Sequence, residues 1–80
     1  MQIRLLAFGI ARDILGRQEL RWEVGQTATV SQLRQQLYSK YPALNELRSL
    51  AIAVNEEYAE ENHGLRENDE VVLIPPVSGG

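Results

Sequence analysis

The chain has 80 residues, of which 44% are hydrophobic and 24% are charged, and its net charge is −3. This composition predicts one small folded domain and argues against a sequence-independent nucleic-acid binder, which uses basic residues to displace phosphate counterions. Because cysteine is absent, disulfides, thiolate metal sites and a cysteine nucleophile are excluded.

Two strands and a short helical turn are predicted near the N-terminus. Residues 2–8, QIRLLAF, alternate in the manner of a strand, although one of its two faces is only partly polar. Residues 10–16 predict a helical turn that ends at Gly16, where glycine suits a left-handed conformation. Residues 19–24, ELRWEV, alternate cleanly between apolar and charged side chains and predict the second strand.

The main helix is predicted to follow Thr29. Thr29 and Gln32 have the spacing of a capping box, in which each side chain bonds the backbone amide of the other residue. Apolar residues then recur at helical spacing as far as Tyr41. The helix should end there because the residue before Pro42 avoids helical angles. Residues 43–49 predict another brief helical turn.

The second half of the chain predicts three further strands. LAIAV, residues 50–54, is a nearly continuous apolar run of the kind found in central strands. A turn at Asn55 and Glu56 leads to a short edge strand at residues 57–59. After a polar loop, EVVLIP at residues 70–75 predicts the last strand, and two prolines then stop further ladder pairing.

This order of elements predicts a mixed sheet of about five strands with one main helix packed on one face, an α+β roll of the ubiquitin-like β-grasp kind. Residues 1–75 would form the domain, and residues 76–80 a flexible C-terminal tail. No apolar run reaches the roughly 18 residues that a membrane helix needs, so we expect a cytoplasmic protein that binds no membrane and no nucleic acid. The predicted core consists of Ile3, Leu5, Leu20, Trp22, Val24, Val30, Leu33, Leu37, Ile52, Val54, Val71 and Leu73.

The tail could have a chemical role. Gly79 and Gly80 lack a Cβ atom and can enter a slot too narrow for other residues. Pro75 and Pro76 would hold the root of the tail extended, which reduces the entropy lost on insertion. A terminal carboxylate becomes an electrophile once it is joined to AMP. The simpler alternative is a frayed end with no function.

Three segments carry a resemblance to a known family. They are residues 8–13, FGIARD, with Gly16 after them; residues 53–55, AVN; and residues 68–80, NDEVVLIPPVSGG. Over essentially its whole length, the sequence resembles the small subunit of molybdopterin synthase, a sulfur carrier. Asn68 stands where the family often has glycine, and asparagine also tolerates left-handed angles.

The resemblance implies that Gly80 carries sulfur and that the chain is a non-catalytic subunit. An adenylyltransferase similar to the ubiquitin-activating enzyme would use ATP and magnesium to adenylate Gly80, and a sulfur donor protein would supply the sulfur of a thiocarboxylate. The large synthase subunit, which holds the catalytic lysines, would pass this sulfur to cyclic pyranopterin monophosphate in molybdenum cofactor biosynthesis. The family pairs two small with two large subunits, and this chain would hold no metal and no permanently bound cofactor.

Docking to the large subunit is expected on the exposed face of the sheet. Phe8, Tyr58 and Ile74 could form an apolar patch there, and family members have hydrophobic residues at the matching positions of the subunit contact. The alternative is that Phe8 packs under the neighbouring loop. The inserted tail would add contacts from Pro75, Pro76, Val77, Ser78 and Gly79.

Several polar residues have less specific interpretations. Arg12 and Asp13 match the family and form either a solvated pair or a partner contact. His63 is expected to be an exposed loop residue. An acidic run is either a solvated face or a surface that steers a basic partner; it consists of Glu56, Glu57, Glu60 and Glu61.

Three other functions remain open. A ubiquitin-like protein modifier would share the activation of Gly80 but would be joined to lysines of other proteins. A sulfur carrier of thiazole synthesis would have the same fold and ending, although such chains are typically shorter and lack the Pro-Pro-Val segment. An interaction domain with an inert tail is the least specific alternative.

Overall fold

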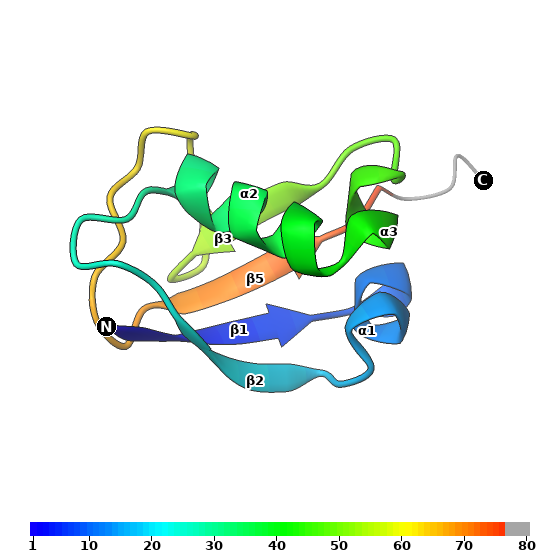
Figure 1. The fold of residues 1–80 in the computed structure, drawn as a ribbon, viewed down its shortest axis with the longest axis horizontal. Helices are drawn as coiled ribbons and strands as arrows, with labels where there is room; N and C mark the ends of the chain where they lie inside the picture. Colours follow the sequence, from blue (N-terminus) through cyan, green and yellow to red (C-terminus); the bar gives the residue numbers. More distant parts are fainter. Residues whose placement is uncertain (77–80) are drawn as a thin grey trace.

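The computed structural model describes residues 1–76 of the chain, and in these residues five strands form one mixed sheet in the order β2-β1-β5-β3-β4 (Figure 1). β1 pairs with β5 in parallel, and the other neighbouring strands are antiparallel. Every strand predicted from the sequence is confirmed. The bounds are β1 Gln2–Ala7, β2 Glu19–Glu23, β3 Ala51–Val54, β4 Glu57–Tyr58 and β5 Glu70–Ile74.

The longest helix of the described residues, α2 (Val30–Lys40), crosses one face of this sheet (Figure 1). Its predicted capping box is present, because the Gln32 amide donates to Thr29 Oγ1 at 3.3 Å and the Thr29 amide donates to Gln32 Oε1 at 3.0 Å. Tyr41 caps its C-terminal end, and the chain continues directly into α3 (Pro42–Asn45). The sheet with this main helix confirms the predicted α+β β-grasp architecture.

Left-handed backbone angles occur at the predicted turns. Gly16, with φ of 84°, caps α1 (Gly9–Leu15), and its amide donates to the Arg12 carbonyl at 2.8 Å. Asn68, with φ of 66°, has the conformation that glycine would otherwise supply at this turn. The residue types at these two positions therefore account for the left-handed backbone angles of both turns.

The core lies between the inner face of the sheet and α2. Most of the predicted core residues are buried, but Leu20 and Trp22 are only partly buried. Both lie on β2, an edge strand that pairs only with β1 among the described strands. Trp22 keeps a polar contact there, because its Nε1 donates to Gln36 Oε1 on α2 at 3.2 Å. Buried hydrophobic residues that the sequence prediction missed are Ala7, Ala11, Leu15, Ala28, Leu44, Leu50, Ala53 and Leu65.

Arg34 ties α2 to two other parts of the chain. Its Nε and Nη2 donate to the Glu61 carboxylate at 2.9 to 3.2 Å, and its Nη1 donates to the Leu50 carbonyl at 2.6 Å. The hydrogen bonds to Glu61 raise the pKa of Arg34. These bonds therefore hold the loop before β5 against α2. Glu61 has a structural role in this contact, in addition to the two roles predicted for the acidic run.

Candidate functional site

The last described residues lie beside the start of α1. β5 ends at Ile74, and the chain then passes through Pro75 and Pro76, which are both partly exposed. Pro75 Cγ lies 3.7 Å from the position that a Cβ atom would have on Gly9. Gly9 itself has φ of 56°, a conformation that favours glycine. The root of the predicted tail therefore packs next to the first turn of α1.

Two exposed apolar side chains flank this point. Phe8, which caps the N-terminal end of α1 in an extended conformation, is 44% exposed, and Ile10 is 46% exposed. The predicted outward position of Phe8 is confirmed, whereas Ile10 was not among the predicted site residues. The helical spacing of the apolar residues indicates this position. Ala11 and Leu15, four residues apart, are the buried positions of α1, so Ile10 lies on a different side of the helix.

The outer face of the sheet connects Phe8, Ile74 and Tyr58 through residues that were not among the predicted contact residues. The strand registers place Leu6 beside Val72, Val72 beside Ala53, and Ala53 beside Tyr58, which is 77% exposed. Because side chains alternate along a strand, this row lies on the face opposite the core. We call the whole set the sheet-face band: Leu6, Phe8, Ala51, Ala53, Tyr58, Val72 and Ile74.

A charged group borders the band where β1 and β5 begin. Arg4 bonds Glu19 on β2 at 3.1 Å and approaches Glu70 on β5 at 3.4 Å. These side chains are about one-third to one-half exposed, so each pair contributes at most about 1 kcal/mol to stability. The outer face thus changes from charged to apolar along β1 and β5 toward the predicted tail.

The start of β5 is fixed by a polar network around the buried Asp69. The Asp69 side chain, in a residue only 8% exposed, accepts hydrogen bonds from Asn55 Nδ2 at 2.9 Å and from the Arg66 amide at 2.7 Å. Asn55 Oδ1 in turn accepts from the Glu70 amide at 3.0 Å. Asn55 and Asp69 both lie in the segments that carry the family resemblance, so the structure gives them a role in positioning β5.

Replacing Asp69 with alanine is expected to destabilise the fold by about 1 to 3 kcal/mol. The change removes the buried carboxylate that accepts hydrogen bonds from Asn55 and from the Arg66 amide, and hydrogen bonds to a charged group contribute about that much. Urea denaturation followed by circular dichroism measures the effect. Glu67→Ala is the matched control because Glu67 is exposed in the same loop. Equal midpoints for the two variants would contradict the role of the network.

The remaining polar candidates stay on the surface. Arg12 and Asp13 are exposed, and neither forms an ion pair within 4 Å among residues 1–76. His63 is exposed as predicted, and its carbonyl accepts from the Val30 amide at 3.0 Å. In the described part of the chain, no group of three or more possible metal ligands converges, and no helix is long and apolar enough to span a membrane.

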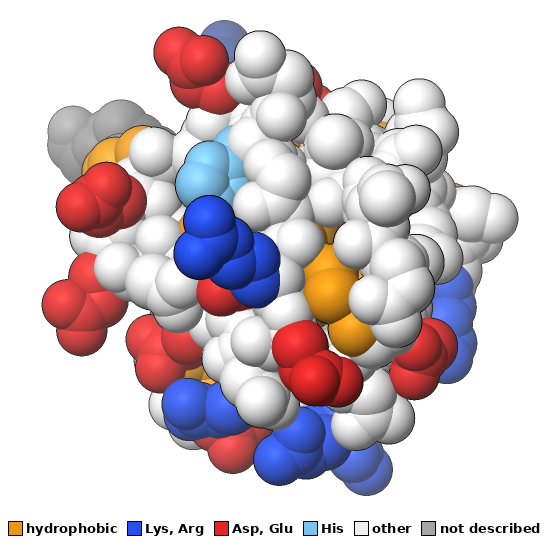
Figure 2. Space-filling model, turned by 90° about the vertical axis from the view of Figure 1, so that its left-hand side faces the viewer, with side chains coloured by type: hydrophobic (Ala, Val, Ile, Leu, Met, Phe, Trp, Pro, Cys, Tyr) orange, Lys and Arg blue, Asp and Glu red, His pale blue; other side chains and the backbone are white. Residues whose placement is uncertain are grey.

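The end of the molecule that carries the N-terminus is polar. Figure 2 shows this end with acidic and basic side chains interspersed and few hydrophobic ones visible. α1 and the last described residues lie at the opposite end (Figure 1). Gly79 and Gly80, together with the predicted contact residues Val77 and Ser78, lie outside the described residues.

Comparisons with known proteins connect this architecture to sulfur carriers and protein modifiers. The model of the ThiS family matches residues 5–80. A molybdopterin synthase sulfur carrier subunit of Chlamydomonas reinhardtii is 36% identical over 83 residues, and the match covers all of both chains. Both comparisons therefore extend through the Gly-Gly sequence.

Two solved structures have the same fold. The small archaeal modifier protein SAMP1 of Haloferax volcanii superimposes with a TM-score of 0.85 and 26% identity over the full length of both chains. A chain from the complex of subunits 1 and 2 of the molybdopterin-converting factor of Helicobacter pylori has a TM-score of 0.70 and 27% identity, again over the full length of both chains. The same fold therefore occurs both in a protein modifier and in a two-subunit factor.

Proposed function

The chain belongs to the ThiS family, and from this premise we propose that it is the sulfur carrier subunit of a molybdopterin synthase. The observation that carries the proposal is its similarity to a curated sulfur carrier subunit, at 36% identity over the whole of both chains. The β-grasp fold and the Gly79-Gly80 sequence support the same function. Gly80 is the residue on which the sulfur is carried.

The proposed chemistry takes place on the α-carboxyl group of Gly80. On a ubiquitin-activating-like adenylyltransferase, a carboxylate oxygen attacks the α-phosphorus of ATP and pyrophosphate leaves. Sulfide-level sulfur supplied by a donor protein then attacks the carbonyl carbon of Gly80, the bond to AMP breaks, and a thiocarboxylate remains. Transfer of this sulfur to cyclic pyranopterin monophosphate, with water supplying the replacing oxygen, returns the carboxylate. ATP and magnesium belong to the activating enzyme, and the general acids and bases to the large subunit.

The sheet-face band is the proposed docking surface for the large subunit. It is a contiguous apolar area that reaches the predicted tail root at Pro75, with Phe8 and Tyr58 exposed and Ala53 buried between its neighbours. Apolar areas that reach the surface in this way mark protein interfaces. The Helicobacter pylori relative, which forms a complex of subunits 1 and 2, supports such a partner. Docking through this band would bring the root of the tail to the partner's surface, with Ile10 and Phe8 beside it.

The mass of the intact protein from its own cells tests the proposal. We expect a fraction of the chains to carry the mass increase of one sulfur in place of one oxygen, and fragmentation to locate it at Gly80. Cells that lack the adenylyltransferase are the control, in which only the carboxylate form should remain. A chain that is never thiocarboxylated in cells that contain the complete pathway would refute the function.

A protein modifier is the second candidate, because the SAMP1 fold covers the full chain at a TM-score of 0.85. Such a modifier would form an amide bond between Gly80 and a lysine of another protein. Deletion of the large subunit gene distinguishes the two candidates. A modifier would still form conjugates in the deletion strain, whereas a dedicated sulfur carrier would accumulate there as the thiocarboxylate.

A further inference from the structure

The outer edge of β2 has no strand beside it among the described residues. β2 is the last strand of the sheet order and pairs only with β1 there. The Val24 amide donates to the Met1 carbonyl and the Ala7 amide donates to the Gln18 carbonyl, both at 2.8 Å. Because paired and unpaired backbone groups alternate along an antiparallel strand, the even-numbered residues of β2 face β1. The backbone groups of Glu19, Arg21 and Glu23 therefore point toward the open edge.

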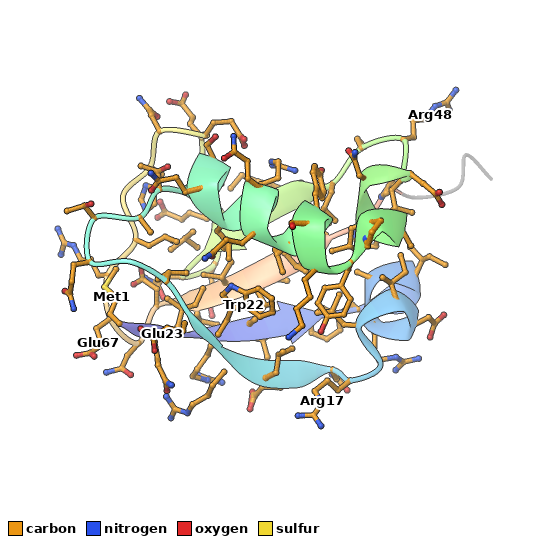
Figure 3. The ribbon with its side chains drawn as sticks, in the orientation of Figure 1. Met1, Arg17, Trp22, Glu23, Arg48 and Glu67 are labelled. Atoms are coloured by element: carbon orange, nitrogen blue, oxygen red, sulfur yellow. The ribbon has the colours of Figure 1, made fainter. Side chains whose placement is uncertain are left out.

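The side chains along this edge are charged and alternate in sign. Glu19, Arg21 and Glu23 are exposed, while Leu20 and Trp22 between them are partly buried. Figure 3 shows Trp22 beneath α2 and the Arg17 side chain directed away from the sheet. β2 is the last strand of the sheet order, and Figure 1 shows no helix or strand of the described residues along its outer side. An open edge of this kind is a template for pairing with another strand, and its charges decide which strands it accepts.

Arg21 differs from the two glutamates of this edge in its charge pairing. Glu19 bonds Arg4 at 3.1 Å, and Glu23 bonds the Met1 ammonium group at 2.7 Å, which lowers the pKa of Glu23. Arg21 stands directly opposite Arg4 in the register of β1 and β2 and forms no ion pair within 4 Å in residues 1–76. A carboxylate supplied by a neighbouring strand would relieve the repulsion between these two arginines.

We propose that two copies of this chain associate through their β2 edges, antiparallel and about a two-fold axis at Leu20. In this register Glu19 of one copy faces Arg21 of the other, and Arg21 faces Glu19. Both are positions whose backbone groups point outward, so each pair also exchanges its main-chain hydrogen bonds. Leu20, which is partly buried in the single chain, meets its own copy at the axis.

The charges select this register over its neighbours. A shift that centres the axis on Arg21 would place the two arginines against each other and Glu19 against Glu23, so every charged pair would repel. Centring on Trp22 would pair Arg21 with Glu23 but would place Glu19 opposite the uncharged Gly25. With the axis at Leu20, Arg17 also falls opposite Glu23, which adds a further pair of opposite charges.

The expected dimer is weak and leaves the proposed docking surface free. Only short segments of the two chains overlap, and small interfaces of this kind are typical of transient complexes. The sheet-face band lies on β1, β5, β3 and β4 and not on β2, and the member nearest to the open edge, Leu6, lies one strand inward from it beside Glu19. Self-association through β2 therefore does not depend on the proposed sulfur-carrier function, and the two can be tested separately.

Sedimentation velocity of the full chain over a range of protein concentrations tests the proposal. We expect concentration-dependent dimers that weaken as salt is added, because the paired charges are exposed. Arg21→Glu should raise the dissociation constant about tenfold or more, since both symmetric pairs change from attractive to repulsive. Glu19→Arg should have the same effect. Arg48→Glu is the matched control: Arg48 is exposed and lies far from β2 (Figure 3).

Mixing the two single variants identifies the register. In a mixed pair, positions 19 and 21 are both arginine in the E19R chain and both glutamate in the R21E chain. Every facing pair is then attractive, so the mixture should dimerise although each variant alone does not. The doubly exchanged variant, E19R with R21E, should recover the original dissociation constant within about threefold. A chain that stays monomeric at all concentrations, a mixture that fails to dimerise, or equal effects of R21E and R48E would overturn the proposal.

Discussion

Deletion of Gly80 is expected to abolish sulfur transfer and to leave the folded domain unchanged. The shortened chain still ends in a carboxylate, now on Gly79, but its reach falls by about 3.4 Å. A misplacement of about 1 Å at a reacting centre costs on the order of 10²-fold in rate, so we expect no measurable product. The melting temperature should not change, because the core and the sheet end at Leu73 and Ile74.

The experiment uses the chain together with its adenylyltransferase, sulfur donor and large subunit, and measures the pterin product. Exchange of pyrophosphate into ATP shows whether a loss arises at the adenylation step or later. Glu67→Ala is the control, since it leaves the tail unchanged and Glu67 is exposed at the end of the molecule opposite α1 (Figure 3). It should retain the activity of the unchanged chain. Product formation by the deletion variant at the rate of the unchanged chain would refute the role of Gly80.

Replacing Phe8 with arginine is expected to weaken binding to the large subunit by at least about 2 kcal/mol, or about 30-fold in Kd. The ring is 44% exposed and adjoins the tail root in the apolar area that we propose as the docking surface. Arginine removes its apolar contact area and places a charge where a docked partner would exclude water. Isothermal titration calorimetry with the purified large subunit measures the change.

Gln35→Arg is the control for this substitution. Gln35 is exposed on α2, which covers the opposite face of the sheet, and the variant introduces the same side chain. It should bind the large subunit with the affinity of the unchanged chain. Both variants should keep their melting temperatures, because neither residue belongs to the buried core. Equal affinities for the Phe8 and Gln35 variants would exclude Phe8 from the interface.

Together these two variants separate the chemical role of the tail from the docking of the domain. A protein modifier would also lose its activity without Gly80, but it would have no need of the large subunit. The Phe8 variant should therefore impair a dedicated sulfur carrier in cells and spare the formation of conjugates by a modifier. The pattern of losses across the two variants decides between the two candidate functions.

Features set by neighbouring residues could be predicted from the sequence. The capping box of Thr29 and Gln32, the left-handed conformations of Gly16 and Asn68, and the end of α2 before Pro42 are all confirmed. Each depends on side chains or backbone angles within a few residues. Alternation of apolar residues likewise located the strands near residues 2–8 and 19–24, and a nearly continuous apolar run located the strand near residues 50–54, because both patterns are local properties of the sequence.

The candidate site could be predicted only in part. Phe8, Ile74 and Tyr58 were expected to form an apolar patch on the exposed face. Leu6 was expected on the same face as Phe8, but neither Leu6 nor Val72 was predicted to connect the patch. Those residues become neighbours because β5 lies between β1 and β3, and alternation within single strands does not give that order. The roles of Glu61 and Asp69 were also missed, since their partners Arg34 and Asn55 are distant in the sequence.

The sequence by itself determined the elements, the caps and turns, and the family resemblance that directs attention to Gly80. Only the tertiary structure decided that Leu20 and Trp22 stay partly exposed, that the band on the outer face is continuous, and that Arg21 stands against Arg4 on an open edge. The physical reason is that burial and charge pairing depend on which strands lie side by side. That order arises when β5 pairs with both β1 and β3, through contacts between residues far apart in the chain.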